Sequence, residues 1–268
     1  MAKILAISSH VVRGHVGLDA AVPALQWLGH EVWALPTVLL ASRPGLGRMM
    51  RHELPASDLA GMLSALELDG CWPSLDAVFT GYFVTPEAVA AAAQAIRRIK
   101  AANPSVLVLV DPILGDAGRL YVLAETAEAI RRELIPLAAV AAPNLFELAW
   151  LTGAAAQSPD DMAQAARHLG PATVAVTSAA ESEATITTLL VTERDRIERV
   201  APRRAGIPNG AGDLFAGLLL GHLLNGRAGE AALDASLADL DRVLAASAGR
   251  EVLQLSALTV PGRHGSPG

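Results

Sequence analysis

The chain has 268 residues, of which 52% are hydrophobic and 18% are charged, and its 21 Lys and Arg against 27 Asp and Glu give a formal net charge of −6. This acidic balance argues against a nucleic-acid binder or an anionic-membrane binder, because both partners favour a basic face. The single cysteine, Cys71, excludes an intramolecular disulfide and any zinc site built on paired thiolates.

The amino terminus and the cysteine usage indicate a cytoplasmic protein. The first residues carry one Lys and an apolar run that is too short for the hydrophobic region of a signal peptide. No apolar run approaches the ~18 residues that a membrane span needs. A lone cysteine fits a reducing compartment. We therefore expect a cytoplasmic protein that acts on a small molecule and has neither a membrane nor a nucleic acid as its partner.

Short apolar runs alternate along the chain with longer segments whose apolar residues recur at helical spacing. Most of the runs are rich in Val, Leu and Ala and lack polar alternation, which is typical of parallel strands covered on both faces. In chain order, we predict a strand at 3–7, a helix at 18–28, a strand at 31–39, a helix at 57–66, a strand at 75–80, a helix at 86–99, a strand at 105–110, a helix at 124–134, a strand at 140–142, a helix at 159–169, strands at 172–177 and 187–191, and a long apolar helix after the small-residue turn at 207–212.

This order of elements predicts an α/β fold, a doubly wound layer sandwich with right-handed crossovers. Ligands of such folds bind at the carboxyl ends of the strands. The loosest segments are 40–51 and 193–208, which are rich in Arg, Gly and Pro and are either covers over a ligand or plain surface loops. We predict one domain over residues 1–260 and a disordered tail over residues 261–268.

The turn before the last predicted helix carries the clearest chemical motif. Gly210 and Gly212 let backbone N–H groups converge at a helix N-terminus, where the helix dipole favours an anion. Asp213 lies in the first helical turn, beside the place of that anion. A carboxylate there is either a helix cap or part of phosphate chemistry, and the short motif alone leaves both open. The turn is not a Walker A loop, because no Gly-Lys-Ser/Thr follows.

The segment Gly210-Ala211-Gly212-Asp213 resembles the anion-hole signature of the ribokinase-like (PfkB) superfamily, and further motifs resemble the pyridoxal kinases within it. The opening segment Ser8–Gly17 resembles the first loop of that family, and Asp111–Asp116 resembles its central segment. The remaining matches, in family order, are Thr80-Gly81-Tyr82, Leu120-Tyr121-Val122, Ala142–Glu147, Leu151-Thr152-Gly153 and Thr177-Ser178. The resemblance implies a ribokinase-like three-layer α/β/α sandwich with a mostly parallel central sheet.

The resemblance also implies roles in phosphoryl transfer, which requires neutralised phosphate charge, a base on the accepting hydroxyl and in-line geometry. Asp213 is the implied base, and the N–H groups of Gly210, Ala211 and Gly212 hold the charge that develops on the γ-phosphate. Asp111 and Glu147 bind Mg²⁺ directly or through water. The residues implied on the nucleotide side are Asp111, Asn144, Glu147, Thr177 and Ser178, with Asp116 and Tyr121 in the loop beside the nucleotide.

Each of these motifs has a plain structural alternative. Asp111-Pro112 by itself is also a strand-ending turn, and Asn144 to Glu147 also fits a helix cap with its capping box. On the acceptor side, the resemblance implies that Ser9, Val16, Thr37 and Tyr82 surround a pyridine ring. Val16 and Thr37 equally fit packing at a strand edge.

On the acceptor side, the stretch after Thr37 departs from the family. After Thr37, pyridoxal kinases usually continue with a Gln and then a Phe-Ser-Asn-His-Thr stretch that reaches toward the substrate, whereas this chain has 38–45 as Val-Leu-Leu-Ala-Ser-Arg-Pro-Gly. The departure leaves the identity of the alcohol open.

The resemblance as a whole predicts an ATP-dependent, Mg²⁺-requiring pyridoxal kinase that phosphorylates the 5′-hydroxymethyl group of a B6 vitamer. Two alternatives stand beside this prediction: a kinase of another hydroxymethyl heterocycle, such as hydroxymethylpyrimidine, and a non-catalytic protein that binds a nucleotide or pyridoxal 5′-phosphate. The resemblance also implies a homodimer, and the apolar strand at 31–39 is the segment we expect at its interface.

Overall fold

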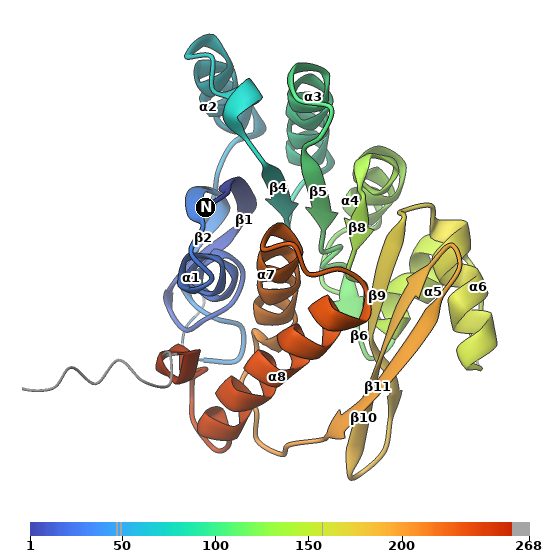
Figure 1. Ribbon diagram of the computed structural model, residues 1–268. Coiled ribbons are helices and arrows are strands. Elements are labelled where there is room, and N and C mark those ends of the chain that lie inside the picture. The colour runs from blue at the N-terminus through green and yellow to red at the C-terminus, as the bar shows by residue number, and fades with distance from the viewer. Residues whose placement is uncertain (47, 49, 157, 259–268) are drawn as a thin grey trace, which may run out of the picture.

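The computed structural model describes residues 1–46, 48, 50–156 and 158–258, and its centre is a nine-stranded sheet in the order β11-β10-β9-β8-β5-β4-β1-β2-β3 (Figure 1). The inner strands are parallel to one another, and the antiparallel pairs of the described sheet lie at its edges. The parallel strands are β1 (Lys3–Arg13), β2 (Glu31–Ser42), β4 (Ala77–Thr80), β5 (Leu107–Val110), β8 (Val140–Ala141) and β9 (Thr173–Glu181); the edge strands are β3 (Arg51–Glu53), β10 (Thr185–Thr192) and β11 (Arg196–Pro202). A small separate hairpin, β6 (Gly115–Asp116) and β7 (Arg119–Leu120), follows β5.

Helices cover both faces of the sheet (Figure 1). One face carries α1 (Leu18–Trp27), α7 (Ala211–Leu224) and α8 (Glu230–Ser247); the other carries α2 (Ala56–Leu68), α3 (Pro86–Ala102), α4 (Ala124–Ala129), α5 (Leu145–Thr152) and α6 (Pro159–Leu169). Short turns lie at Trp72–Ser74, Ile135–Leu137 and Leu255–Leu258, and a π-helical turn, Ile130–Leu134, continues α4. The expected three-layer α/β/α arrangement with a mostly parallel sheet is confirmed.

The alternation of side chains along β1 explains why the sheet needs both layers. Ile4 and Ala6 pack in the core shared with α1 and α7, whereas Leu5 and Ile7 pack in the core shared with α2, α3 and α4. All four are fully or almost fully buried. The strand therefore reads as a continuous apolar run, because neither of its faces meets water.

Helix α7 is apolar on every side because it lies between the sheet, α1 and α8. Gly217 allows the close approach to α1, since a Cβ at this position would lie 2.9 Å from the Cα of Ala21. This packing fixes the start of α7, which carries Asp213, against the end of β1 and the start of α1.

The structure corrects two of the expected segments. The predicted loop at 193–208 contains β11, whose residues alternate between exposed and half-buried and so lack the apolar run of the inner strands. The predicted loop at 40–51 is shorter, because β2 extends to Ser42 and β3 begins at Arg51. The strand predicted at 187–191 is antiparallel to both of its neighbours, as a mostly parallel sheet allows. Helix α8 was not among the predicted elements.

Two further expectations concern the carboxyl-terminal tail and membrane-spanning helices. The predicted tail at 261–268 lies outside the described residues. None of the helices in the described part of the chain combines the length and the apolar character that crossing a membrane requires.

Candidate active site

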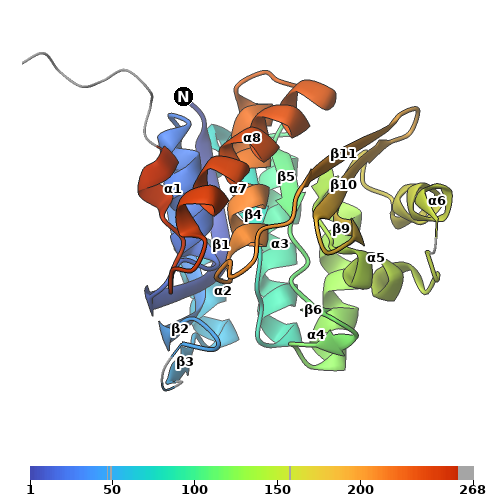
Figure 2. The ribbon, with the colours of Figure 1, turned by 90° about the horizontal axis from the view of Figure 1, so that it is seen from below.

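The predicted site residues gather at one edge of the sheet, where the parallel strands end. Figure 2 shows the β2–β3 hairpin and β6 on this same side of the molecule. Because parallel strands end at a common edge, residues far apart in the sequence meet there. Tyr82, Asp111 and Asn144 come just after the short strands β4, β5 and β8. The longer strands β1, β2 and β9 run past this level and carry Ser9, Thr37, and Thr177 with Ser178 inside them.

Asp213 lies in the first turn of α7, which begins at Ala211. Burial raises the pKa of its carboxyl group to about 6, and the backbone N–H of Gly17, which faces this carboxylate, acts in the opposite direction. The oxygen Oδ1 of Asp213 is buried and has no hydrogen-bond partner among the described residues. Buried polar atoms without a partner are rare in proteins, so this oxygen marks a place where a donor from a ligand fits.

The start of α7 also has the features of an anion site. The first N–H groups of a helix have no acceptor within the helix, and the helix dipole places partial positive charge there. Gly210, in front of the helix, adopts the left-handed conformation with φ of 111°. Gly212 is exposed, and a Cβ at this position would meet nothing within 4 Å, so the space beside the turn is open. Free N–H groups at a helix start and open space beside them are the features that an anion hole needs.

Asp111 is almost fully buried, and the negative charge of Asp213 acts on its carboxyl group. Its pKa is raised well above the ordinary value, first by burial and then by the negative charges of Asp213 and Glu147. No donor among the described residues makes a hydrogen bond to its carboxylate. The three carboxyl groups therefore form one acidic cluster that a cation or protons would stabilise.

Glu147 has a different environment, because backbone N–H groups hold both of its carboxylate oxygens. Oε1 accepts from the N–H of Leu114 at 2.8 Å and of Gly115 at 3.3 Å, and Oε2 accepts from the N–H of Asn144 at 2.9 Å. Burial raises the pKa of Glu147 to about 8, and these N–H groups act against that rise. Glu147 thus clamps the loop that leads into β6.

Asn144 completes this clamp. Its side-chain oxygen accepts from the N–H of Glu147 at 2.9 Å, and its Nδ2 donates to the carbonyl oxygen of Gly115 at 2.9 Å. The capping box, which the sequence allowed as an alternative interpretation, is therefore present at the start of α5. It fixes Glu147 within the acidic cluster and places Asn144 beside it.

The other residues of the predicted nucleotide side lie on β9 and on the β6–β7 hairpin. The N–H of Thr177 donates to the carbonyl oxygen of Pro143 at 2.9 Å, and Ser178 adopts a positive φ of 49°, which is uncommon outside glycine. Asp116 and Tyr121 lie on the exposed hairpin, where the Tyr121 side chain is largely in solvent. The N–H of Tyr121 donates to the carbonyl oxygen of Leu114 at 2.7 Å, which joins the hairpin to the loop that Glu147 holds.

The residues predicted around the alcohol form a second group. The hydroxyl of Thr37 donates to the carbonyl oxygen of Tyr82 at 2.7 Å, and the hydroxyl of Ser8 accepts from the Tyr82 N–H at 3.0 Å. Ser9 and Val16 are both buried. Ser9 lies against the loop that contains Val16, because a Cβ on Gly17 would lie 2.2 Å from the Ser9 hydroxyl oxygen. Sequence reasoning missed the role of Ser8, although it belongs to the same motif as Ser9.

The stretch that departs from the family forms the β2–β3 hairpin and is tied to the carboxyl-terminal part of the chain. Arg43 Nε donates to the carbonyl oxygen of Glu251 at 3.0 Å, and Arg13 forms an ion pair with the Glu251 side chain at 2.7 Å. Asn209, which precedes the anion hole, donates to the carbonyl oxygen of Pro44 at 3.3 Å. No local signal could have identified Glu251, because it lies far from Arg13 and Arg43 in the sequence.

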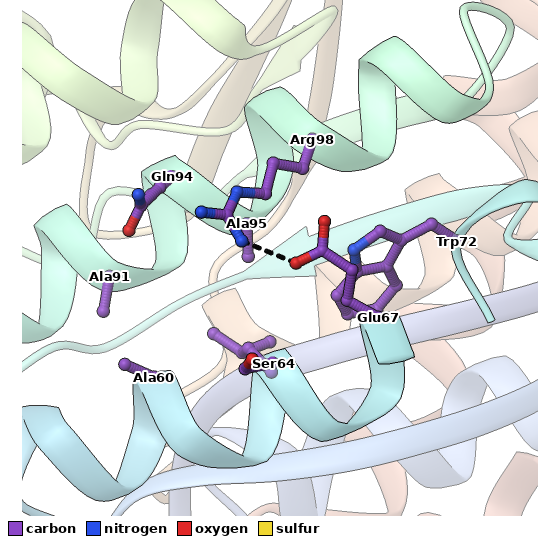
Figure 3. A pocket seen from close by; sticks show the side chains of 9 residues that line it. Ala60, Ser64, Glu67, Trp72, Ala91, Gln94, Ala95 and Arg98 are labelled. Carbon is purple, nitrogen blue, oxygen red and sulfur yellow. Dashed lines mark hydrogen bonds and ion pairs between the residues drawn. The ribbon is translucent and has the colours of Figure 1, made fainter. Parts of the chain in front are cut away.

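A separate cavity between α2 and α3 is unrelated to this site (Figure 3). It has a volume of about 30 Å³, and Arg98 forms an ion pair with Glu67 beside it at 2.6 Å. The space suffices for only one or two water molecules. Trp72, whose indole Nε1 has no hydrogen-bond partner among the described residues, lines it.

Comparison with known proteins identifies relatives over most of the chain. A family profile described as phosphomethylpyrimidine kinase matches residues 36–255. A pyridoxal kinase, PdxY, of Rubrobacter xylanophilus is 37% identical over 90% of this chain and 86% of its own length.

Among solved structures, the pyridoxal kinase from Entamoeba histolytica has a TM-score of 0.89 at 27% identity and covers 96% of this chain and 93% of its own. The pyridoxal kinase from Leishmania donovani in complex with ADP and pyridoxamine has a TM-score of 0.88 at 28% identity, covering 96% of this chain and 94% of its own.

Proposed function

Because the chain belongs to the pyridoxal kinase family of ribokinase-like proteins, we propose that it transfers the γ-phosphate of ATP to the 5′-hydroxymethyl group of a B6 vitamer. The observation that carries this proposal is the buried Oδ1 of Asp213, which lacks a partner among the described residues at the start of α7. An alcohol O–H is a donor that would satisfy this oxygen and present its own oxygen to a phosphate at the anion hole.

In the proposed reaction, the hydroxymethyl oxygen attacks the γ-phosphorus while its proton passes to Asp213. The bond between the γ-phosphorus and the bridging oxygen breaks, and ADP leaves with that electron pair. The N–H groups of Gly210, Ala211 and Gly212 stabilise the charge that the transferred group spreads over its oxygens. A pKa of about 6 suits Asp213 for this role, because the carboxyl group is ionised at neutral pH yet basic enough to take a proton.

We further propose that Asp111 holds Mg²⁺, with Glu147 contributing through water. The donor set fits this ion: Asp111 is a carboxylate without a hydrogen-bond donor among the described residues, and it lies beside two further carboxyl groups. A cation that keeps most of its waters needs few ligands from the protein, and these carboxylates would supply them. When bound, the ion neutralises phosphate charge.

The remaining predicted residues take supporting roles in this proposal. Asn144, Thr177 and Ser178 contact the ATP phosphates from the ends of β8 and β9, and Asp116 and Tyr121 lie beside the nucleotide. Ser9, Val16, Thr37 and Tyr82 surround the vitamer, with Thr37 and Ser8 holding the backbone of Tyr82 in place.

A second candidate is a kinase of hydroxymethylpyrimidine. It is favoured by the description of the matching family profile and by the altered stretch at 38–45. Both alcohols are flat heterocycles with a hydroxymethyl group, so the same base and anion hole serve either, and the pocket beside the β2–β3 hairpin decides between them.

We also propose a cytoplasmic homodimer. Only Val38–Leu40 of β2 pair with β3, so the amino-terminal half of β2 is an open edge in the described sheet. A second copy could pair with this edge. The lone cysteine fits a reducing compartment, where ATP is also available. Light scattering on a size-exclusion column measures the mass directly.

The decisive experiment incubates the chain with Mg-ATP and pyridoxal and follows pyridoxal 5′-phosphate by absorbance and ADP release in parallel. We expect product from the wild-type chain and none from Asp213→Asn, which keeps its fold and its ATP binding. Hydroxymethylpyrimidine tested in the same assay separates the two candidates. Tight binding of ATP or pyridoxal 5′-phosphate without turnover of either alcohol would instead identify a non-catalytic member.

A further inference from the structure

We propose that Asp19 is a positioning residue for Asp213: it closes the loop between β1 and α1 and thereby keeps the Gly17 N–H facing the base. The inference rests on the proposed function, because it assigns Asp19 a part in the same transfer. The side chain of Asp19 makes its contacts with Val11 and His10, which have no proposed contact with phosphate or vitamer, and its backbone N–H donates to the carbonyl oxygen of Val16 at 3.2 Å.

The carboxylate of Asp19 connects the two ends of this loop. Its Oδ2 accepts from the backbone N–H of Val11 at 2.6 Å and lies 2.9 Å from Nδ1 of His10, both in β1. The ring of His15 contacts the backbone carbonyl oxygen of Asp19 at 3.2 Å. Asp19 is thus joined to the strand before the loop and to the loop itself, while its own backbone belongs to the first turn of α1.

The loop needs such a closure because glycine gives it freedom. Gly14 and Gly17 both have positive φ, of 120° and 57°. Glycine adopts such values without strain, but it also adopts many others, so these two residues do not fix the conformation of the loop by themselves. Contacts with the rest of the fold must therefore select the loop's conformation. Those of Asp19 with His10, Val11 and His15 contribute, beside the close approach of Gly17 to Ser9 and of His15 to Gly210.

The conformation matters because the loop faces the base. The N–H of Gly17 favours the ionised form of Asp213, against the effect of burial. If the loop relaxes, the carboxylate loses its one backbone donor from outside α7 and is free to rotate away from the alcohol. A small displacement of a base lowers the rate of the chemical step while leaving binding largely intact.

The test compares Asp19→Ala with Asp19→Asn. Alanine removes the acceptor, and we expect kcat to fall by about tenfold, with KM for pyridoxal and for ATP within about twofold of the wild type. Asparagine retains a carbonyl oxygen for the Val11 N–H, so we expect it to recover most of kcat. Amide hydrogen exchange at Gly17, measured by NMR, should accelerate in Asp19→Ala and stay near wild type in Asp19→Asn.

Asp76 provides the matched control, because its Oδ2 accepts from the backbone N–H of Lys3 at 2.7 Å at the opposite end of the sheet. Asp76→Ala should leave kcat and the Gly17 exchange rate unchanged. If Asp19→Ala does not fold, Asp19→Glu takes its place with the same expectations, because its longer side chain moves the acceptor away from Val11.

Wild-type kcat and exchange in Asp19→Ala, an equal loss in Asp76→Ala, or no recovery in Asp19→Asn would each overturn the inference. These outcomes are distinct from failure of the proposed function. That failure would show as turnover retained in Asp213→Asn, or as no turnover in the wild type.

Discussion

Gly210 and His15 are in direct backbone contact: a Cβ built on Gly210 would lie 1.8 Å from the carbonyl oxygen of His15. Gly210 precedes the anion hole, and His15 belongs to the loop between β1 and α1. The left-handed conformation of Gly210, with φ of 111°, is one that side chains adopt only with strain. The two loops around the proposed base are therefore locked together at a point where only glycine fits.

This contact predicts that Gly210→Ala is strongly destabilising. The backbone conformation alone should cost about 1–3 kcal/mol, and the clash with His15 adds to it. Urea unfolding measures the loss. Gly212→Ala is the control, because a Cβ there meets nothing within 4 Å and the residue has no positive φ. Equal stability of the two variants would contradict the prediction.

The raised pKa of Asp213 predicts an acid limb in the pH dependence of kcat/KM at about 6. The base must be ionised to accept the proton, so kcat/KM should fall about tenfold per pH unit below that value. The charged groups around Asp213 are Asp111 on the side of β5 and Asp19 on α1, with His10 and His15 beside Asp19.

In Asp19→Asn one negative charge near the base is lost, so the limb should move to lower pH. A limb in the wild type that lies near pH 4, the ordinary range of an aspartate, would show that another group or another step controls the rate.

The acidic cluster predicts that the protein becomes less stable as pH rises. Burial raises the pKa of Asp111, Asp213 and Glu147, so the folded chain binds protons more tightly than the unfolded chain. The stabilisation that protons provide is complete below the unfolded values near 4 and is lost as pH rises toward about 8, the value for Glu147. Without Mg²⁺, the free energy of unfolding in urea should decline from pH 5 to pH 8.

Asp111→Asn should make this decline shallower, because it removes the group of the cluster on which burial and the charges of Asp213 and Glu147 all act. Asp58→Asn, on the exposed face of α2, should leave the decline as in the wild type. A decline of unchanged slope in Asp111→Asn would show that the cluster does not control the pH dependence.

Addition of Mg²⁺ should reverse part of the loss at pH 8. A cation that binds the folded chain alone stabilises it by about 1.4 kcal/mol at ten times its Kd. The gain should be smaller at pH 5.5, where protons compete for the carboxylates, and absent in Asp111→Asn. Melting temperatures with and without Mg²⁺ measure it; an equal gain in Asp111→Asn would place the ion elsewhere.

We predict that breaking the clamp between Asn144 and Glu147 lowers both the stability of the protein and its affinity for the nucleotide. Asn144→Ala removes the cap of α5 and the hydrogen bond to Gly115, so it should cost about 1 kcal/mol or more and raise KM for ATP. Ser158→Ala is the matched control, since Ser158 caps α6 with a capping box of its own. It should lower stability by a similar amount with KM unchanged.

Some of the fold could be predicted because its signals are local. The inner strands are buried on both faces, so runs such as the one that became β5 are apolar throughout and stand out. Strand β11 has no such run, because it lies at the edge of the sheet and every second residue is exposed to solvent. Its formation depends on pairing with β10. Edge strands are therefore the elements that local patterns miss.

By itself, the sequence determined the alternation of strands and helices, the places where polar residues follow strand ends, and the motif at Gly210 to Asp213. These features depend on neighbouring residues along the chain. Only the tertiary structure decided that His15 meets Gly210, that Asp19 closes the loop facing Asp213, and that backbone N–H groups occupy the carboxylate of Glu147. Such contacts join segments distant in sequence, and their geometry comes from the packing of whole layers, which no local pattern encodes.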